Sequence, residues 1–182
     1  MEGVIQGELV PGTLARAASG DEEAFARIVA LYDDDVVRVA YLVSGDIGIS
    51  HEAASSTWSI AWRKLQSVRD DQHVRAWLAA VAGNEARQLM RRQRRYTVRE
   101  ISLQTFAEGP PGSVATNNQD ANLDLMAALT QLDPQDRAIV AMRYGLGLSS
   151  FEIARAIGMS APGVRSRLQR SLERLRKELS DD

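Results

Sequence analysis

Apolar side chains recur at spacings of three and four positions through the first half of the chain, as they do along one buried face of an α-helix. The first such stripe follows the acidic run Asp21-Glu22-Glu23, which suits the positive end of a helix dipole, and stops before Gly45. Two further stripes predict helices from about Ser50 to Leu65 and from about His73 to Arg95, with a polar segment at 66–72 between them. The pattern therefore predicts a small bundle of three helices.

The three tryptophans, Trp58, Trp62 and Trp77, lie on these stripes, so we expect them in the bundle core. Partial exposure of Trp62 and Trp77 beside the polar segment is the alternative. Residues 1–18 show little periodicity, and we expect a loose arm or a short first turn there.

The last third of the chain carries shorter apolar stripes, separated by residues that start and stop helices. A helix is predicted over residues 121–132, with Leu125 on its buried face. Asp133-Pro134 is an N-cap followed by proline at the first helical position, and the helix that it opens ends at Gly145.

A short helix and a longer one follow, and their boundaries are well marked. Ser149 and Glu152 form an S-x-x-E capping box, Gly158 suits the residue after a helix end, and Ser160 caps the last helix. A short helix, a turn with glycine and a longer helix make a helix-turn-helix, the motif that places its second helix in the major groove of DNA. A plain amphipathic surface helix is the alternative for the last element.

We therefore predict an all-α protein of two small helical domains joined by a flexible linker. The first domain covers residues 1–96 and the helix-turn-helix domain covers residues 121–182. The linker, 97–120, has no sustained periodicity and contains Gly109-Pro110-Pro111-Gly112.

Composition narrows the possible functions. The 182 residues include no cysteine, which excludes disulfides, zinc knuckles and thiol catalysis, and the two histidines are isolated, so we expect no metal and no cofactor. No apolar run approaches the roughly 20 residues that span a bilayer. The absence of a signal-peptide pattern agrees with that, and we expect a cytoplasmic protein without membrane insertion.

The formal net charge of −2 conceals two basic blocks. Residues 61–102 carry a net +6 and residues 137–182 a net +4, whereas residues 1–60 and 103–136 carry −7 and −5. Separate basic blocks indicate two contacts with a polyanion, although solvated helix faces would give the same pattern.

The DNA contacts predicted on the last helix lie at its N-terminal end and on its polar side, with Arg165 and Arg167 flanking the apolar stripe, which runs from Val164 to Leu179. They comprise Ser160, Pro162, Arg165, Ser166, Arg167, Gln169 and Arg170. Near the end of the third helix, Arg91, Arg92, Arg94 and Arg95 exceed what a helix C-terminus needs for its dipole, so a phosphate-contacting surface is predicted there.

Motifs in both halves resemble those of bacterial extracytoplasmic-function (ECF, group 4) RNA polymerase sigma factors. In the C-terminal part these are Arg143-Tyr144-Gly145, Ser149-Ser150-Phe151-Glu152-Ile153-Ala154, Gly158-Met159-Ser160 and Gly163-Val164-Arg165-Ser166-Arg167-Leu168. In the N-terminal part they are Asp21-Glu22-Glu23-Ala24-Phe25, Ala61-Trp62 and Val74-Arg75-Ala76-Trp77-Leu78.

This resemblance implies that the first domain binds the clamp of RNA polymerase core and opens the promoter −10 element. Segment 66–72 would then hold a flipped base, with Asn84 and Arg87 nearby and the arginines at 91–95 on the DNA. The last domain would read the −35 element, the linker would thread the polymerase RNA channel, and an anti-sigma factor would hold the protein inactive. The residues implied in polymerase binding are Glu52, Ser55, Ser56 and Trp58.

The chain departs from the family pattern at three places, one of which is Pro162, where a small residue is common early in the last helix. The first turn of a helix tolerates proline. Ser55 and Ser56 stand where glutamine and glutamate usually bind the clamp, and Gly83 stands where an arginine usually precedes Asn84. Glycine weakens a helix by about 1 kcal/mol relative to alanine.

Three functions follow as hypotheses. The leading one is a sigma factor without catalysis of its own, and the first alternative is a sigma-like DNA-binding regulator that lacks stable binding to core polymerase. The second alternative is an enzyme acting on DNA, for which Tyr96 beside Arg94 and Arg95 is the faint candidate nucleophile.

Overall fold

The computed structural model describes residues 9–68, 70–101 and 119–179, and these ranges contain helices and no strand. The predicted all-α class is therefore confirmed for this part of the chain. None of its helices is both long enough and apolar enough to cross a bilayer. The linker prediction falls mostly on residues 102–118, which lie outside the described residues.

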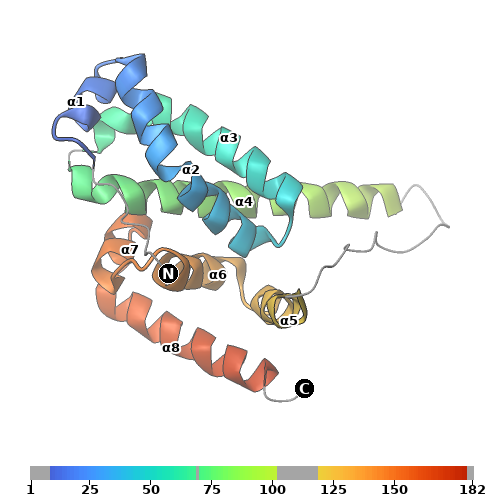
Figure 1. Cartoon of the computed structure of the whole chain (residues 1–182). Helices are drawn as coiled ribbons and strands as arrows, with labels where there is room; N and C mark the ends of the chain where they lie inside the picture. Colours follow the sequence, from blue (N-terminus) through green and yellow to red (C-terminus); the bar gives the residue numbers. More distant parts are fainter. Residues whose placement is uncertain (1–8, 69, 102–118, 180–182) are drawn as a thin grey trace.

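The N-terminal half is a bundle built around α2 (Glu22–Ser44), α3 (Ile47–Lys64) and α4 (Asp71–Ile101), which pack on one another (Figure 1). Asp21 caps α2 by accepting a hydrogen bond from the Ala24 amide, and Gly45 ends it in the left-handed region at φ 72°. Asp46 caps α3 by accepting from the Ile49 amide, so that helix begins before Ser50.

A short helix and a single 3-10 turn complete this half. The sequence allows either a loose arm or a short first turn before the bundle, and the structure has a short helix there, α1 (Thr13–Ala18). Leu14 and Ala17 of this helix are buried against the bundle. The turn η1 (Leu65–Ser67) leads from α3 toward α4.

Helix α4 extends beyond the predicted end of the third helix. It is 31 residues long and continues to Ile101, inside the segment expected as linker. Its C-terminal end projects past the bundle (Figure 1).

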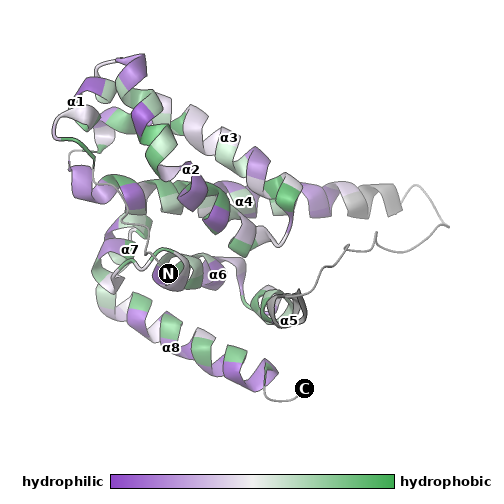
Figure 2. Cartoon of the chain, in the orientation of Figure 1, coloured by the Kyte–Doolittle hydropathy of each residue, from purple (hydrophilic) through white to green (hydrophobic). Residues whose placement is uncertain are grey.

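The C-terminal half consists of α5 (Gln119–Thr130), α6 (Pro134–Val140), a π-helical turn η2 (Ala141–Gly145), α7 (Ser150–Ile157) and α8 (Ala161–Glu178). The predicted caps are confirmed: the side chains of Asp133, Ser149 and Ser160 each accept a backbone amide, and Gly158 adopts φ 70°. In Figure 2, hydrophobic and hydrophilic residues alternate around α8, as in an amphipathic helix.

Two leucines predicted on buried faces are exposed. Leu125 is 40% exposed, because burial on the described part of α5 begins only at Ala128. Leu179 is 47% exposed, because it follows the last helical residue and lies beyond Leu175, where the packed stripe of α8 ends.

The two halves pack on each other. Helix α6 lies against α2 and α4, and α7 lies against α4. One apolar cluster joins Val39 and Val43 of α2 to Ile139, Met142 and Ile153 of the C-terminal half. A second cluster, which includes Ile28, Val74 and Leu78, belongs to the N-terminal bundle alone.

An ion pair between α2 and α4 fixes the start of α4. The Nε of Arg75 donates to Oδ2 of Asp35 at 2.6 Å, and the side chains are 20% and 12% exposed. Mostly buried partners depend on each other, because either one left alone is an uncompensated charge.

The capping box of α7 yields a prediction. Ser149→Ala should lower the free energy of unfolding by about 1 kcal/mol, measured by urea denaturation. Hydrogen bonds from Ser149 lower the pKa of Glu152 below its ordinary 4.5, so the contribution of Glu152 is complete above that pH and is lost as pH falls through the lowered value. The difference in free energy of unfolding between Ser149→Ala and the wild type should therefore become smaller in acid. The control Ser150→Ala, at the next residue, should show neither the loss of stability nor its pH dependence.

The Asp35–Arg75 pair yields a second prediction. Asp35→Ala should destabilise the protein by about 3 kcal/mol, and the double variant Asp35→Ala/Arg75→Met should recover part of that loss. Glu23→Ala, which breaks the exposed Arg27–Glu23 pair, should change stability little. A double variant less stable than Asp35→Ala would show that the pair does not behave as a buried, mutually dependent unit.

Candidate nucleic-acid interface

The outer face of α8 carries most of the residues predicted to contact DNA. Ser160 accepts a hydrogen bond from the Gly163 amide at 3.2 Å and fixes the start of the helix, while Val164 and Leu168 anchor the opposite face in the core. The residues on the solvent side are exposed: Ser160, Pro162, Arg165, Ser166, Gln169 and Arg170. The helix thus presents a polar face of hydrogen-bonding side chains at its N-terminal end.

Arg167 differs from its neighbours on this helix. Its side chain is 28% exposed, and its Nη1 lies 3.3 Å from Oδ1 of Asp136, on α6. Both atoms are buried without a hydrogen bond, so the contact is Coulombic. The structure therefore places Arg167 toward the N-terminal part of α6 rather than on the outer face, a contact that the spacing along α8 did not indicate.

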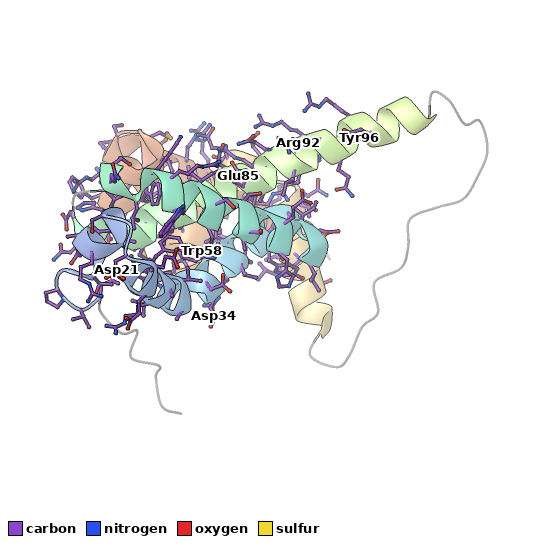
Figure 3. All side chains as sticks on the ribbon, turned by 90° about the horizontal axis from the view of Figure 1, so that it is seen from above. Asp21, Asp34, Trp58, Glu85, Arg92 and Tyr96 are labelled. Carbon is purple, nitrogen blue, oxygen red and sulfur yellow. The ribbon has the colours of Figure 1, made fainter. Side chains whose placement is uncertain are left out.

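The four arginines predicted near the end of α4 are accessible to solvent. Arg91, Arg92, Arg94 and Arg95 are exposed on the part of the helix that leaves the bundle, and Figure 3 shows Arg92 and Tyr96 there. Tyr96, at 68% exposure, lies on this projecting rod rather than in a recess where a nucleophile would meet several partners.

Asn84 and Arg87 lie in a different environment from these arginines. The Nη2 of Arg87 donates to Oδ1 of Asn84 at 3.1 Å, and both line a groove of about 470 Å³ whose other wall contains Gln135, Ala138 and Met142. Burial lowers the pKa of Arg87, and the charges of Arg91 and Arg167 lower it further, while Asp133 acts in the opposite direction. The six residues predicted on α4 are therefore divided between a half-buried pair in this groove and an exposed group near the end of the helix.

Within the predicted segment 66–72, Ser67, Val68 and Asp70 line a small recess beside the start of α4. The carboxylate of Asp70 accepts from the Gln72 amide at 3.0 Å and lies 2.6 Å from Nδ1 of His73. The Gln72 hydrogen bond is the main cause of the lowered pKa of Asp70, and the charges of His73 and Arg155 lower it further. Arg155 reaches over this recess from α7: its guanidinium contacts the ring of His73, and its Nη1 lies 3.9 Å from Asp70.

The residues implied in polymerase binding share one stretch of α3. Glu52 and Ser55 are exposed, Ser56 is half-buried, and Trp58 donates from Nε1 to Oδ1 of Asp33 at 2.7 Å. Trp58 and Asp34 of α2 are labelled in Figure 3. Nothing in the sequence pattern pairs Asp33 with a tryptophan 25 positions away, so this orienting contact was not foreseen.

Of the two interpretations of Trp62, a core position is wrong and the alternative of partial exposure is the one that the structure shows. It is 43% exposed and packs edge-on against Phe25, with ring centroids 5.0 Å apart, at the edge of the bundle. Trp58 and Trp77 are half-buried.

Comparison with known proteins places these surfaces in a family. The sequence matches Sigma-70 region 2 over residues 28–96 and Sigma-70, region 4 over residues 122–175. The chain is 30% identical over 177 residues to the ECF RNA polymerase sigma factor SigE of Mycolicibacterium smegmatis, and the alignment covers 93% of this chain and 68% of that protein. It is 27% identical over 175 residues to the probable RNA polymerase sigma factor RfaY of Xanthomonas campestris pv. campestris; that alignment covers 91% of this chain and 43% of RfaY.

A solved structure shares the fold. The sigma factor RpoE in complex with the anti-sigma factor NepR, from Bartonella quintana, superposes with a TM-score of 0.67 at 23% identity, over 88% of this chain and 99% of RpoE. Together with the two matched regions, which occur in the same order as the two halves described above, these relatives show that the chain belongs to the extracytoplasmic-function family of RNA polymerase sigma factors.

Proposed function

We propose that this chain binds the core of RNA polymerase in the cytoplasm and directs it to a promoter, without catalysing a reaction itself. The observation that carries the proposal is the pairing of a region 2 match and a region 4 match with two exposed basic surfaces, one on each region. We assign residues 1–96 to polymerase and −10 binding and residues 121–182 to −35 binding, with residues 97–120 as the connection.

The face of α8 supports duplex reading. Arg165 and Arg170 are exposed near the N-terminal half of the helix, the part that enters a major groove in helix-turn-helix proteins. A guanidinium can donate two hydrogen bonds to a guanine edge, and Ser166 and Gln169 beside these arginines supply further donors and acceptors. Arg167 would reach DNA only after leaving Asp136, so we assign it the weaker contribution.

The tip of α4 supports phosphate binding. Its four arginines project from the bundle where a strand could pass beside them, and each contact with a phosphate would release condensed counterions. Asn84 and Arg87, with segment 66–72, would meet the unpaired bases of the −10 element.

The exposed stretch of α3 is the surface that we assign to core polymerase. Trp58 is held by Asp33 and by an edge contact with Phe25 at 6.1 Å, so a rigid aromatic group lies next to exposed Glu52 and Ser55. RpoE of Bartonella quintana binds an anti-sigma factor, and we propose a partner of the same kind for this chain.

A second candidate function is a sigma-like DNA-binding regulator that does not hold core polymerase stably. It is favoured by Ser55 and Ser56, whose short hydroxyl side chains make fewer charged contacts than the usual glutamine and glutamate. Pull-down of purified core polymerase by the purified chain at near-physiological salt separates the two functions. Run-off transcription with core enzyme on genomic fragments, followed by mapping of start sites, then identifies the promoter.

The serines yield a prediction for polymerase affinity. Ser55→Gln/Ser56→Glu should tighten binding to core polymerase about 5-fold or more, since each adds a longer polar group to the binding face. The affinity is measured by fluorescence anisotropy of labelled protein, with Ser59→Gln, one turn further along α3, as control. Equal affinities of the double variant and the wild type would remove the serines from the interface.

Arg165 yields a prediction for promoter reading. Arg165→Ala should weaken binding to the mapped −35 duplex by about 1–3 kcal/mol if the arginine reads a base, and the loss should disappear on a scrambled duplex. Arg174→Ala, an exposed arginine two turns further along α8, should change both affinities little. A uniform loss on both duplexes with a smaller salt slope would reassign Arg165 to phosphate contact.

A further inference from the structure

Two arginines flank the buried stripe of α8, and only one of them is exposed. Val164 and Leu168 are buried, and at about 100° per residue Arg165 and Arg167 project to opposite sides of the stripe that these two residues form. Arg165 is exposed, whereas Arg167 is half-buried. A helix in a major groove turns its outer face to the base edges and its flanks to the two sugar-phosphate backbones. Both arginines therefore start from positions that suit contact with a phosphate.

The carboxylate of Asp136 accounts for the difference between these two arginines. Oδ1 of Asp136, on α6, lies 3.3 Å from Nη1 of Arg167, and the side chains of the two residues are 27% and 28% exposed. Both atoms are buried without a hydrogen bond, so the attraction between opposite charges holds the guanidinium there. Asp136 thus occupies the place beside this guanidinium that a backbone phosphate would otherwise take.

The helix backbones on both sides of this pair are fixed by packing. Residues 137–139 of α6 are buried directly after Asp136, and Leu168 of α8 is buried directly after Arg167. Asp136 also lies in the first turn of α6, where the positive end of the helix dipole favours a carboxylate whether or not an arginine is near. The Arg167 side chain, which is long and has several rotatable bonds, is therefore the part of the pair that can move.

A neighbouring arginine makes the position of Arg167 depend on Asp136. Burial is the main cause of the lowered pKa of Arg87, and the charges of Arg91 and Arg167 lower that pKa further. The guanidinium groups of Arg87 and Arg167 therefore repel each other. Without the carboxylate of Asp136, Arg167 would keep this repulsion and lose its attraction, so its charge would be more stable at the solvent side of α8.

We propose that Asp136 is a positioning residue that withholds Arg167 from DNA and thereby lowers the affinity of this chain for any duplex. The inference rests on the proposed −35 binding. A phosphate contact contributes alike on every sequence, so withholding one weakens binding to promoter and non-promoter DNA together. Sequence preference is left to the exposed side chains of α8, which Asp136 does not touch.

The first experiment measures the placement of Arg167 in the absence of DNA. Phenylglyoxal modifies accessible guanidinium groups, and peptide mass spectrometry follows each arginine separately. In the wild type, Arg167 should react severalfold more slowly than Arg165. In Asp136→Asn, which keeps the shape of the side chain and removes its charge, the rate at Arg167 should rise toward that at Arg165. Equal rates at the two arginines in the wild type, or an unchanged rate at Arg167 in the variant, would overturn the proposal.

The second experiment measures the consequence for DNA binding. The probe is a fluorescein-labelled duplex of about 25 base pairs with a scrambled sequence, titrated by anisotropy at several salt concentrations. Asp136→Asn should bind it about 3-fold or more tightly than the wild type at roughly 50 mM salt. The slope of log affinity against log salt should steepen by about one, because one further phosphate is neutralised. The mapped −35 duplex should show the same gain.

Matched variants test whether the gain comes from Arg167. In an Arg167→Gln background, Asp136→Asn should give no gain, since no guanidinium remains to be released. Asp136→Glu keeps a carboxylate at this position and should restore the wild-type affinity. Asp124→Asn removes an exposed carboxylate of α5, so a gain in this variant would indicate a general effect of net charge and would overturn the proposal. Far-UV circular dichroism checks that each variant keeps its helix content.

The outcomes separate this inference from the function on which it rests. Duplex binding by the wild type, together with an Asp136→Asn variant that gains nothing or gains only on the −35 duplex, would overturn the proposal alone. The same holds for a gain that persists in the Arg167→Gln background. Absence of duplex binding by both proteins, with and without core polymerase, would overturn the −35 function and the proposal with it, even if Arg167 reacts slowly in the wild type.

Discussion

Helix α4 is packed on two sides, and the rest of the structure depends on how closely the neighbouring helices can approach it. Toward the bundle it meets α2 and α3, and toward the C-terminal half it meets α6 and α7. A helix buried on two sides needs small residues where its neighbours are closest, and α4 has buried Ala76, Ala79 and Ala86 as well as Gly83. Glycine is a weak helix former, so Gly83 exchanges some stability of α4 for contact with α6.

Local signals in the sequence predict the elements well, because helix starts are decided by side chains within three residues. Asp133, Ser149 and Ser160 each cap the helix that their spacing indicates, and Gly158 ends α7 in a left-handed conformation. A predicted helix boundary is displaced where the capping residue lies outside the apolar stripe. Asp46 caps α3 in this way, so the helix begins at Ile47 and not near Ser50. The end of α4 at Ile101 follows from no apolar pattern, since the helix there extends beyond the packed bundle.

The candidate site is predicted less completely than the elements, because its environment is made by residues far apart in sequence. The exposed face of α8 follows from the spacing of its apolar stripe, and the exposed surface near the end of α4 follows from its run of arginines. The ion pair of Arg167 with Asp136, the coverage of Arg87 and the hydrogen bond of Trp58 to Asp33 do not, since each needs the relative placement of two helices. The same limit explains Trp62, because its exposure depends on how α2 and α3 pack, which leaves it edge-on against Phe25 at the edge of the bundle.

The projecting end of α4 determines where the tether between the two halves is attached. At about 1.5 Å per residue, a helix of 31 residues is a rod of roughly 46 Å, and the chain leaves it at Ile101, on the end away from α7 (Figure 1). The C-terminal half, which begins again at Gln119, is thus anchored at the far end of a lever rather than beside the face that it covers. Any separation of the two halves would therefore turn about a point at the end of α4, outside the N-terminal bundle.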